Sequence, residues 1–191
     1  MRTLISTAFV SLDGVIEGPG GEPGYRNSGW TVNDIEFEEA AYEIKGREQE
    51  EATAMLLGRV SYQAFAPVWP DMTEEFAGYN AMPKYVVSTT LRETDLVSNW
   101  GETHILRSLP DVAALKETEG GPIIVHGSAA LNRNLSDAGL IDRYHLLVFP
   151  VLLGAGKRLF SDTDKDKQNL RLIESESFAN GIQKLVYGLA R

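Results

Sequence analysis

The feature that most constrains the fold of this chain is an apolar run that ends in glycine and leads directly into a helical pattern. Residues 123–131 read Ile-Ile-Val-His-Gly-Ser-Ala-Ala-Leu, which predicts a buried strand, a tight turn and a helix capped by Ser128. The first turn of such a helix has free backbone N–H groups and the positive end of the helix dipole, so it suits the phosphates of a nucleotide. The same pattern occurs at residues 55–58, where Arg59 follows the glycine.

Strand-like segments alternate with helical patterns along most of the chain. Helices are expected over residues 61–65, over 111–118, after Ser128, and from N-caps at Thr31, Asn33 or Asp34 to about residue 50. The Asn180-Gly181 step is a strong hairpin signal. The sequence therefore predicts an α/β fold: a mixed, mainly parallel central sheet with helices on both faces, closed by a C-terminal antiparallel hairpin. Strands are expected at residues 3–10, 54–57, 84–88, 103–106, 123–126, 143–148, 170–175 and 182–189.

Composition narrows the class of protein. With 191 residues the chain is long enough for one domain with a real core, so we expect a single domain over residues 1–191. It has no cysteine, which removes disulfides, thiolate nucleophiles and Cys-containing zinc sites and fits a reducing cytoplasm. The net charge of −9 disfavours general binding to nucleic acid or to an anionic membrane. No apolar run is long enough to span a bilayer, and we see no signal peptide.

Metal catalysis and serine hydrolysis are not expected. The histidines His104, His126 and His145 are scattered, and no ligand-spaced motif joins them. For the last two, which lie in apolar strands, a structural role is the commoner explanation. No Gly-x-Ser-x-Gly elbow is present. Paired catalytic carboxylates stay open, because the helix before residue 50 is rich in glutamate and offers too many candidates.

Nucleotide binding has better support. The ends of three predicted strands carry groups that suit phosphate, and in an open α/β sheet such ends lie at one edge, where ligands bind. The guanidinium of Arg59 can chelate a phosphate, or it can form a surface ion pair with the acidic helix. Residue chemistry alone does not favour either of these two roles of Arg59. The three strand ends are Gly58-Arg59, Ser88-Thr89-Thr90 and Gly127-Ser128.

Four segments in the same order point to a family. Residues 11–16 (Ser-Leu-Asp-Gly-Val-Ile), 57–62 (Leu-Gly-Arg-Val-Ser-Tyr), 124–131 and 140–160 resemble motifs of the dihydrofolate reductase-like superfamily. Within it the chain is most similar to bacterial proteins like the C-terminal reductase domain of the riboflavin-biosynthesis deaminase–reductase. The resemblance covers nearly the whole chain and implies the three-layer dihydrofolate reductase-like fold. No zinc motif of a deaminase half is present.

The resemblance implies a pocket for NADPH. Gly58, Arg59, Ser88 and Thr89 would hold the adenosine side, with Arg59 on the 2′-phosphate. Ala130 stands where dihydrofolate reductases commonly have an arginine, so NADH stays open as the cofactor. The resemblance also implies a homodimer. The pyrophosphate would lie on Gly127, Ser128, Ala129 and Ala130, and the nicotinamide end on Ala8, Val15 and Ile16.

The expected function is NADPH-dependent hydride transfer to a small heteroaromatic substrate, similar to a pteridine or pyrimidine. Asp13 is the candidate for substrate anchoring or proton delivery, although Asp-Gly is also a common turn pair. Trp30, Asp34 and Tyr62 are candidate substrate-binding residues, the two aromatic ones as a flat apolar wall. The alternative is a nucleotide-binding sensor or interaction protein without turnover. The glycine-rich loop at residues 18–24 is either a ligand cover or a surface excursion.

Overall fold

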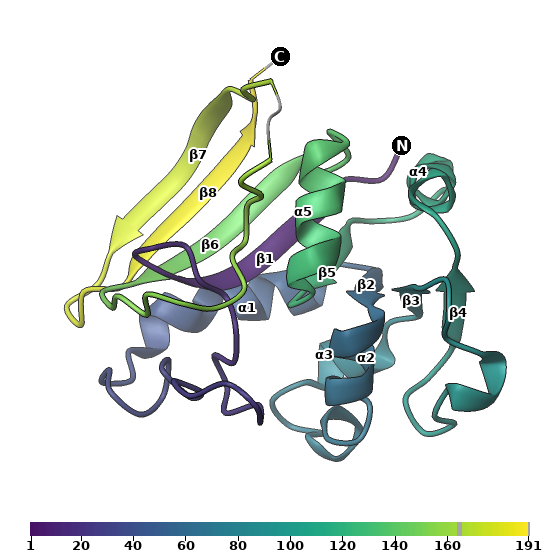
Figure 1. Ribbon diagram of the computed structural model, residues 1–191, viewed down its shortest axis with the longest axis horizontal. Helices are drawn as coiled ribbons and strands as arrows, with labels where there is room; N and C mark the ends of the chain where they lie inside the picture. The colour runs from purple at the N-terminus through teal and green to yellow at the C-terminus, as the bar shows by residue number, and fades with distance from the viewer. Residues whose placement is uncertain (164–165, 191) are drawn as a thin grey trace.

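The computed structural model describes residues 1–163 and 166–190, and it contains one mixed sheet of eight strands in the order β4-β3-β2-β5-β1-β6-β8-β7 (Figure 1). The first six strands run parallel, and β8 runs antiparallel to both β6 and β7. The predicted α/β fold and its C-terminal hairpin are confirmed. The strands are β1 (Leu4–Ser11), β2 (Ala54–Gly58), β3 (Lys84–Val87), β4 (Thr103–Leu106), β5 (Ile123–His126), β6 (Arg143–Phe149), β7 (Leu170–Ser177) and β8 (Gln183–Leu189).

Helices cover both faces of the sheet. Helices α4 (Leu109–Glu117) and α5 (Ala129–Asp137) pack on one face, where their leucine and valine side chains meet those of β1, β2, β5 and β6. Helices α1 (Glu39–Glu51), α2 (Arg59–Phe65) and α3 (Ala77–Ala81) lie on the other face, over two further apolar clusters. Figure 1 shows α5 in front of the sheet and α1 behind it.

The first helix begins later than the sequence predicts. The capping residues Thr31, Asn33 and Asp34 lie in turns, and α1 begins at Glu39. Long-range contacts explain the difference, since the Thr31 hydroxyl donates to the Pro19 carbonyl at 2.7 Å and ties this segment to the preceding glycine-rich loop. Phe37 also lies outside the helix: it precedes α1 and is exposed.

The central strand β1 has different neighbours along its length. It pairs with β5 from Leu4 to Thr7 and with β6 from Ile5 to Ser11. Strand β5 ends at His126, which is paired with Thr7. In the described part of the chain, the edge of β1 that faces β5 therefore has no strand partner beyond Thr7. A crevice at the carboxyl end of parallel strands is where open α/β sheets bind ligands.

Candidate functional site

Two glycine turns meet at the carboxyl edge of the sheet. The backbone N–H of Gly58 donates to the Ser128 hydroxyl at 2.9 Å, and the N–H of Ser128 donates to the Ser61 hydroxyl at 2.9 Å. The Ser128 hydroxyl in turn donates to the carbonyl of His126 at 3.1 Å. The ends of β2 and β5 are thus joined by reciprocal hydrogen bonds. The structure places the two predicted strand–glycine–helix units side by side.

Ser128 does not cap α5 as the sequence predicts. It occupies the N-cap position, but its φ is +64°, and its hydroxyl bonds the neighbouring strands instead of the helix. Gly127 before it has a φ of +59°, and a Cβ there would lie 3.2 Å from the ring of Phe65. The first-turn amides of Ala129, Ala130 and Leu131 therefore have no side-chain cap, and geometry gives them no partner within the helix. Free amides at a helix N-terminus are suited to binding an anion, and these three follow directly after the end of β5.

Arg59 is the first residue of α2 and is exposed. Within the described residues no carboxylate oxygen lies within 4.0 Å of its guanidinium, so the alternative of an ion pair with the acidic helix is not realised. Ser88 is buried after β3, where its hydroxyl accepts from the N–H of Leu91 at 2.9 Å. Thr89 beside it is exposed. The guanidinium is thus free to bind an anion, whereas the Ser88 hydroxyl already shapes a turn.

Asp13 holds two loops together. Its carboxylate accepts from the Ser11 hydroxyl at 2.6 Å, from the N–H of Leu153 at 3.1 Å and from the N–H of Gly154 at 2.8 Å. The Ser11 hydroxyl, with these two amides, lowers the pKa of Asp13 to about 2. The group is therefore ionised at neutral pH, and its oxygens are occupied by the chain itself. This geometry favours a role in holding the two loops together over substrate binding or proton delivery.

The three predicted substrate-binding residues do not come together. Trp30 is 2% exposed and donates its indole N–H to the Glu17 carbonyl at 2.9 Å. Tyr62 is 1% exposed, and its hydroxyl accepts from the N–H of Val97 at 2.9 Å. They belong to separate apolar clusters and do not form one wall. Asp34 is exposed in the loop before α1. Ala8, Val15 and Ile16 are buried, with Ala8 on the side of β1 that faces α4 and α5.

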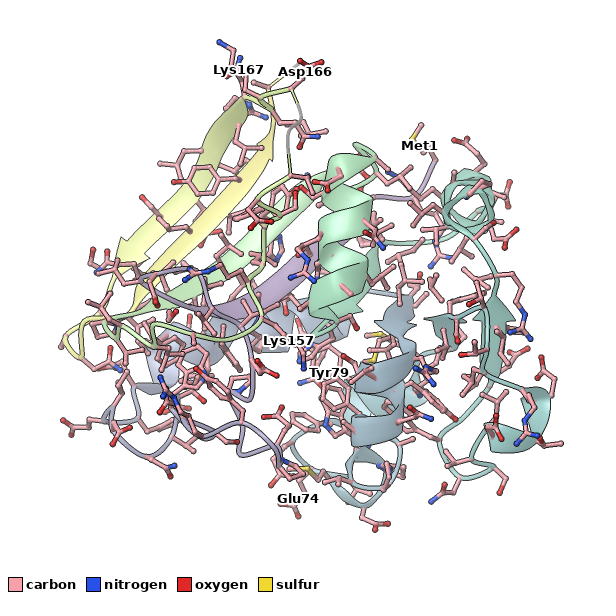
Figure 2. All side chains as sticks on the ribbon, in the orientation of Figure 1. Met1, Glu74, Tyr79, Lys157, Asp166 and Lys167 are labelled. Atoms are coloured by element: carbon pink, nitrogen blue, oxygen red, sulfur yellow. The ribbon has the colours of Figure 1, made fainter. Side chains whose placement is uncertain are left out.

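Sequence reasoning missed a buried polar cluster between α1 and the sheet. Its centre is Glu48, whose Oε1 lies 2.9 Å from His145 Nδ1 and whose Oε2 lies 3.4 Å from Lys45 Nζ. The Thr7 hydroxyl donates to the same carboxylate at 2.8 Å, and the Tyr79 hydroxyl donates to it at 3.1 Å. Figure 2 labels Tyr79, which comes from α3. Lys45 also donates to the Thr7 hydroxyl. Four residues from four elements thus share the carboxylate of Glu48.

Burial and charge act in opposite directions in this cluster. Burial by itself would raise the pKa of Glu48, but the charge of Lys45 and the hydrogen bonds from His145 and Thr7 hold it well below its usual range. Burial lowers the pKa of Lys45, and the carboxylate partly offsets that effect. Burial also raises the pKa of Tyr79. Glu48 is therefore an ionised carboxylate surrounded by groups that donate hydrogen bonds to it.

A sequence signal for this carboxylate existed. Ala41, Ile44 and Glu48 follow the i, i+3, i+7 spacing of one helix face, and all three are buried. Among the many glutamates of α1, Glu48 is the one that falls on the apolar stripe. Lys45 precedes it by three residues, which is the spacing of a helical ion pair.

His126 lies next to this cluster. Its ring packs against those of Phe65, Trp69 and Tyr79, with centroids 5.0–6.0 Å away. In the described residues its buried Nδ1 has no hydrogen-bond partner, so the expected structural histidine is not fully satisfied. Burial, together with the charge of Lys45, lowers the pKa of His126 to about 3. The ring is therefore neutral at neutral pH.

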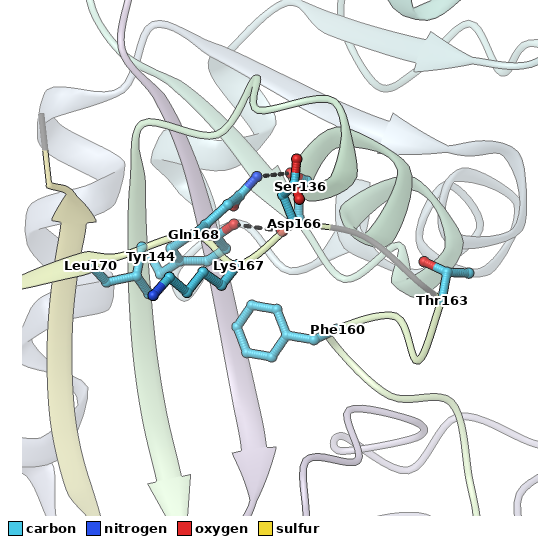
Figure 3. A pocket seen from close by; sticks show the side chains of 8 residues that line it. All are labelled: Ser136, Tyr144, Phe160, Thr163, Asp166, Lys167, Gln168 and Leu170. Carbon is cyan, nitrogen blue, oxygen red and sulfur yellow. Dashed lines mark hydrogen bonds between the residues drawn. The ribbon is translucent and has the colours of Figure 1, made fainter.

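Two hollows lie apart from this edge. One, of about 380 Å³, lies between α5, β6 and β7 (Figure 3), and the other, of about 620 Å³, includes Arg2, Arg143 and Arg171. Neither includes a residue predicted for the cofactor.

Among residues 1–163 and 166–190, no group of three or more histidine, aspartate or glutamate side chains is arranged to hold a metal ion. No helix of this part is long and apolar enough to cross a membrane.

Comparison with known proteins gives a consistent result. The chain is 30% identical over 194 residues to the uncharacterized protein YyaP of Bacillus subtilis (strain 168), covering 97% of this chain and 94% of that protein. It also superposes, with a TM-score of 0.73, 19% identity and full coverage of both chains, on the crystal structure of a protein from Shewanella sp. PV-4 titled "Putative riboflavin biosynthesis protein". That likeness shows the fold. The model of the RibD C-terminal domain matches residues 2–184. The chain therefore belongs to the RibD C-terminal domain family.

Proposed function

We propose that this protein is an NADPH-dependent reductase that transfers hydride to a small heteroaromatic substrate of the pteridine or pyrimidine type. The observation that carries this proposal is the open edge of β1 beyond Thr7, which lies beside the uncapped first turn of α5. Membership of the RibD C-terminal domain family supports the same reading. We further propose a single domain over residues 1–191 that acts in the cytoplasm as a homodimer.

The residues present fit the cofactor. The free amides of Ala129, Ala130 and Leu131 would bind its pyrophosphate, since a helix N-terminus favours anions. The unpaired guanidinium of Arg59 would bind the 2′-phosphate as a planar fork. Among the described residues no carboxylate oxygen lies within 4.0 Å of it, although the chain carries a net charge of −9. The nicotinamide end would lie along the open edge of β1, near Ala8, Val15 and Ile16.

Hydride transfer requires no nucleophilic side chain from the protein. Bound NADPH supplies the hydride, while the protein positions the reactants, excludes water and provides a proton. Asp13 would hold the end of β1 against the loop after β6, because Ser11, Leu153 and Gly154 occupy its carboxylate. Ser61 and Ser128 would keep the two glycine turns at a fixed spacing. The proton source is the part of this reaction that the predicted site residues do not supply.

The proposal is tested by calorimetric titration of the protein with NADPH and with NADH. We expect NADPH to bind more tightly, and Arg59→Ala to weaken it by roughly 10–100-fold, because a hydrogen bond to a charged group contributes about 1.5–3 kcal/mol. The affinity for NADH should not change in that variant. Arg143→Ala is the matched control, since Arg143 is exposed at the opposite end of the strands.

Absence of any heat or thermal stabilisation with either nucleotide would contradict the proposal. The alternative function, a nucleotide-binding sensor without turnover, differs in a second measurement. A sensor would bind NADPH and never oxidise it with pteridine, pyrimidine or carbonyl acceptors.

A further inference from the structure

The cluster around Glu48 contacts β1 at the point where its pairing with β5 ends. Lys45 Nζ bonds the hydroxyl of Thr7, the last residue of β1 that pairs with β5. The same ammonium lies 5.0 Å from the centroid of the Phe9 ring, which belongs to the part of β1 that β5 no longer covers. The charged group thus lies under the two residues of β1 that flank the end of its pairing with β5.

We propose that Lys45 is the proton donor of the reduction, and that the acceptor is a C=N or C=O bond bound above Phe9 on the α1 side of β1. Glu48 is the positioning residue that holds the ammonium in place. This inference rests on the proposed reductase function and adds its proton source and the class of bond that is reduced.

Lys45 differs from its neighbours because its ammonium has one N–H donor left over. An ammonium has three N–H donors, and the structure assigns one to Thr7 and one to Glu48, which leaves one for a ligand. The side chain keeps 12% of its surface exposed, whereas that of Glu48 keeps 1%. Lys45 therefore keeps one N–H without an assigned acceptor, and part of its side chain stays exposed.

The other titratable groups that face Lys45 are less suited to this role. Tyr79 directs its hydroxyl into Glu48, and burial and the carboxylate charge raise its pKa. His145 uses Nδ1 on the same carboxylate. The pKa of His126, lowered by burial to about 3, leaves that ring without a proton to give at neutral pH. Burial lowers the pKa of Lys45 itself, which makes its ammonium a better acid than an exposed lysine.

The step balances. A hydride from bound NADPH forms a C–H bond at the carbon of the C=N or C=O group, and the π electron pair moves to the nitrogen or oxygen. An N–H bond of Lys45 breaks as its proton passes to that atom. The substrate gains two electrons and is reduced, and NADPH is oxidised to NADP⁺. The neutral amine of Lys45 then regains a proton from water.

A first test needs neither cofactor nor turnover. Lysines of the intact protein are labelled with trace acetic anhydride across a pH series, and each site is quantified by mass spectrometry. We expect Lys45 to lose its proton at lower pH than the exposed Lys157, and Glu48→Gln to lower that pH further, because the carboxylate stabilises the ammonium. Lys184 is the matched control, as a buried lysine whose partners Glu174 and Glu176 lie elsewhere. Titration of Lys45 together with the exposed lysines would overturn the proposal.

A second test measures NADPH consumption with a panel of small pteridine, pyrimidine and imine acceptors. Lys45→Arg keeps the positive charge beside Glu48 but does not release a proton. We expect it to retain the parent's thermal stability and NADPH affinity, and to lose about 10²–10⁴-fold in turnover. Lys45→Ala should recover turnover when ethylamine is added, whereas Lys184→Ala should keep the parent's rate without it.

The outcomes separate this inference from the proposed function. Equal rates and pH profiles in the parent and Lys45→Arg would overturn the role of Lys45 and leave the reductase intact. A parent that binds no NADPH, or binds it and consumes none with any acceptor, would overturn the proposed function and the proton donor with it.

Discussion

The two faces of β1 differ in how they bury polar groups. On the face toward α5, the Ser6 hydroxyl donates to Asn132 Oδ1 at 2.7 Å, and both partners are neutral. On the face toward α1, Thr7 bonds a carboxylate that also holds Lys45 and His145. Consecutive residues of one strand point to opposite faces, so a single step along the chain separates a neutral layer from a charged one.

This difference has an energetic meaning. A neutral pair costs little to bury once its hydrogen bond is made. A buried ion pair must offset the desolvation of both charges, and it is strongly destabilising when one partner is removed. The layer toward α5 therefore supports the fold, whereas the layer toward α1 maintains charged groups at a cost that fits a chemical role.

The largest effect is expected from Glu48→Ala. Removing the carboxylate leaves the Lys45 ammonium buried without its counter-charge and the hydroxyls of Thr7 and Tyr79 without their acceptor. We expect the free energy of unfolding to fall by about 3–5 kcal/mol at neutral pH, as measured by urea denaturation.

Glu50→Ala on the same helix is the control for that change, because Glu50 is exposed. Its effect should stay within about 0.5 kcal/mol. A loss in Glu48→Ala as small as in the control would mean that the two layers do not differ in the way described.

A smaller effect is expected in the neutral layer. Ser6→Ala leaves Asn132 Oδ1 buried without the Ser6 donor, and this should cost about 1–3 kcal/mol. Neither partner titrates, so the loss should be the same at every pH where the parent is folded. Urea midpoints at several pH values measure it, and a loss that varies with pH would contradict the assignment of a neutral layer.

The most specific effect is a change of slope with pH in His126→Leu. The pKa of His126 is about 3 in the folded protein, against 6.5 ordinarily, because burial disfavours the charged ring. The unfolded chain therefore binds a proton below pH 6.5 that the folded protein does not. The contribution of His126 to the free energy of unfolding is therefore fully present above pH 6.5. It decreases as the pH falls toward 3, by at most about 1.4 kcal/mol per pH unit.

The leucine variant should lose this part of the slope. The informative window lies between pH 6.5 and 4.5, because the lowered pKa of Glu48 has the same sign but acts only below the ordinary value of 4.5. Parallel stability curves of the parent and the variant in that window would show that the folded protein binds a proton at His126.

Much of the fold was predictable because its signals are local. Alternating apolar segments, the glycine turns and Asn180-Gly181 act over a few residues each, and they predicted the parallel sheet with its closing hairpin. The start of α1 was not predictable in this way. Its capping residues are held by a loop more than ten positions away, through the bond from Thr31 to Pro19.

The candidate site likewise contains some features that local sequence motifs predicted and others that depend on residues far apart in the chain. The turns at Gly58 and Gly127 followed from short motifs, whereas only the structure showed that Arg59 has no carboxylate partner among the described residues. The placement of Trp30 and Tyr62 in separate cores did not, since aromatic residues look alike in sequence whether they pack or bind. The role of the Asp13 carboxylate depends on amides 140 and 141 positions away, at Leu153 and Gly154.

The amino-acid sequence was enough to identify the family, the layered α/β architecture and the two glycine turns at the carboxyl edge of the sheet, because each of these depends on contacts between residues close together in the chain. Only the tertiary structure decided which of many glutamates is buried among proton donors. Glu48 meets Thr7, Tyr79 and His145 across separations of 41, 31 and 97 residues. The pairing register of the sheet and the packing of α1 and α3 on it bring these groups within hydrogen-bonding distance, and no local pattern records that.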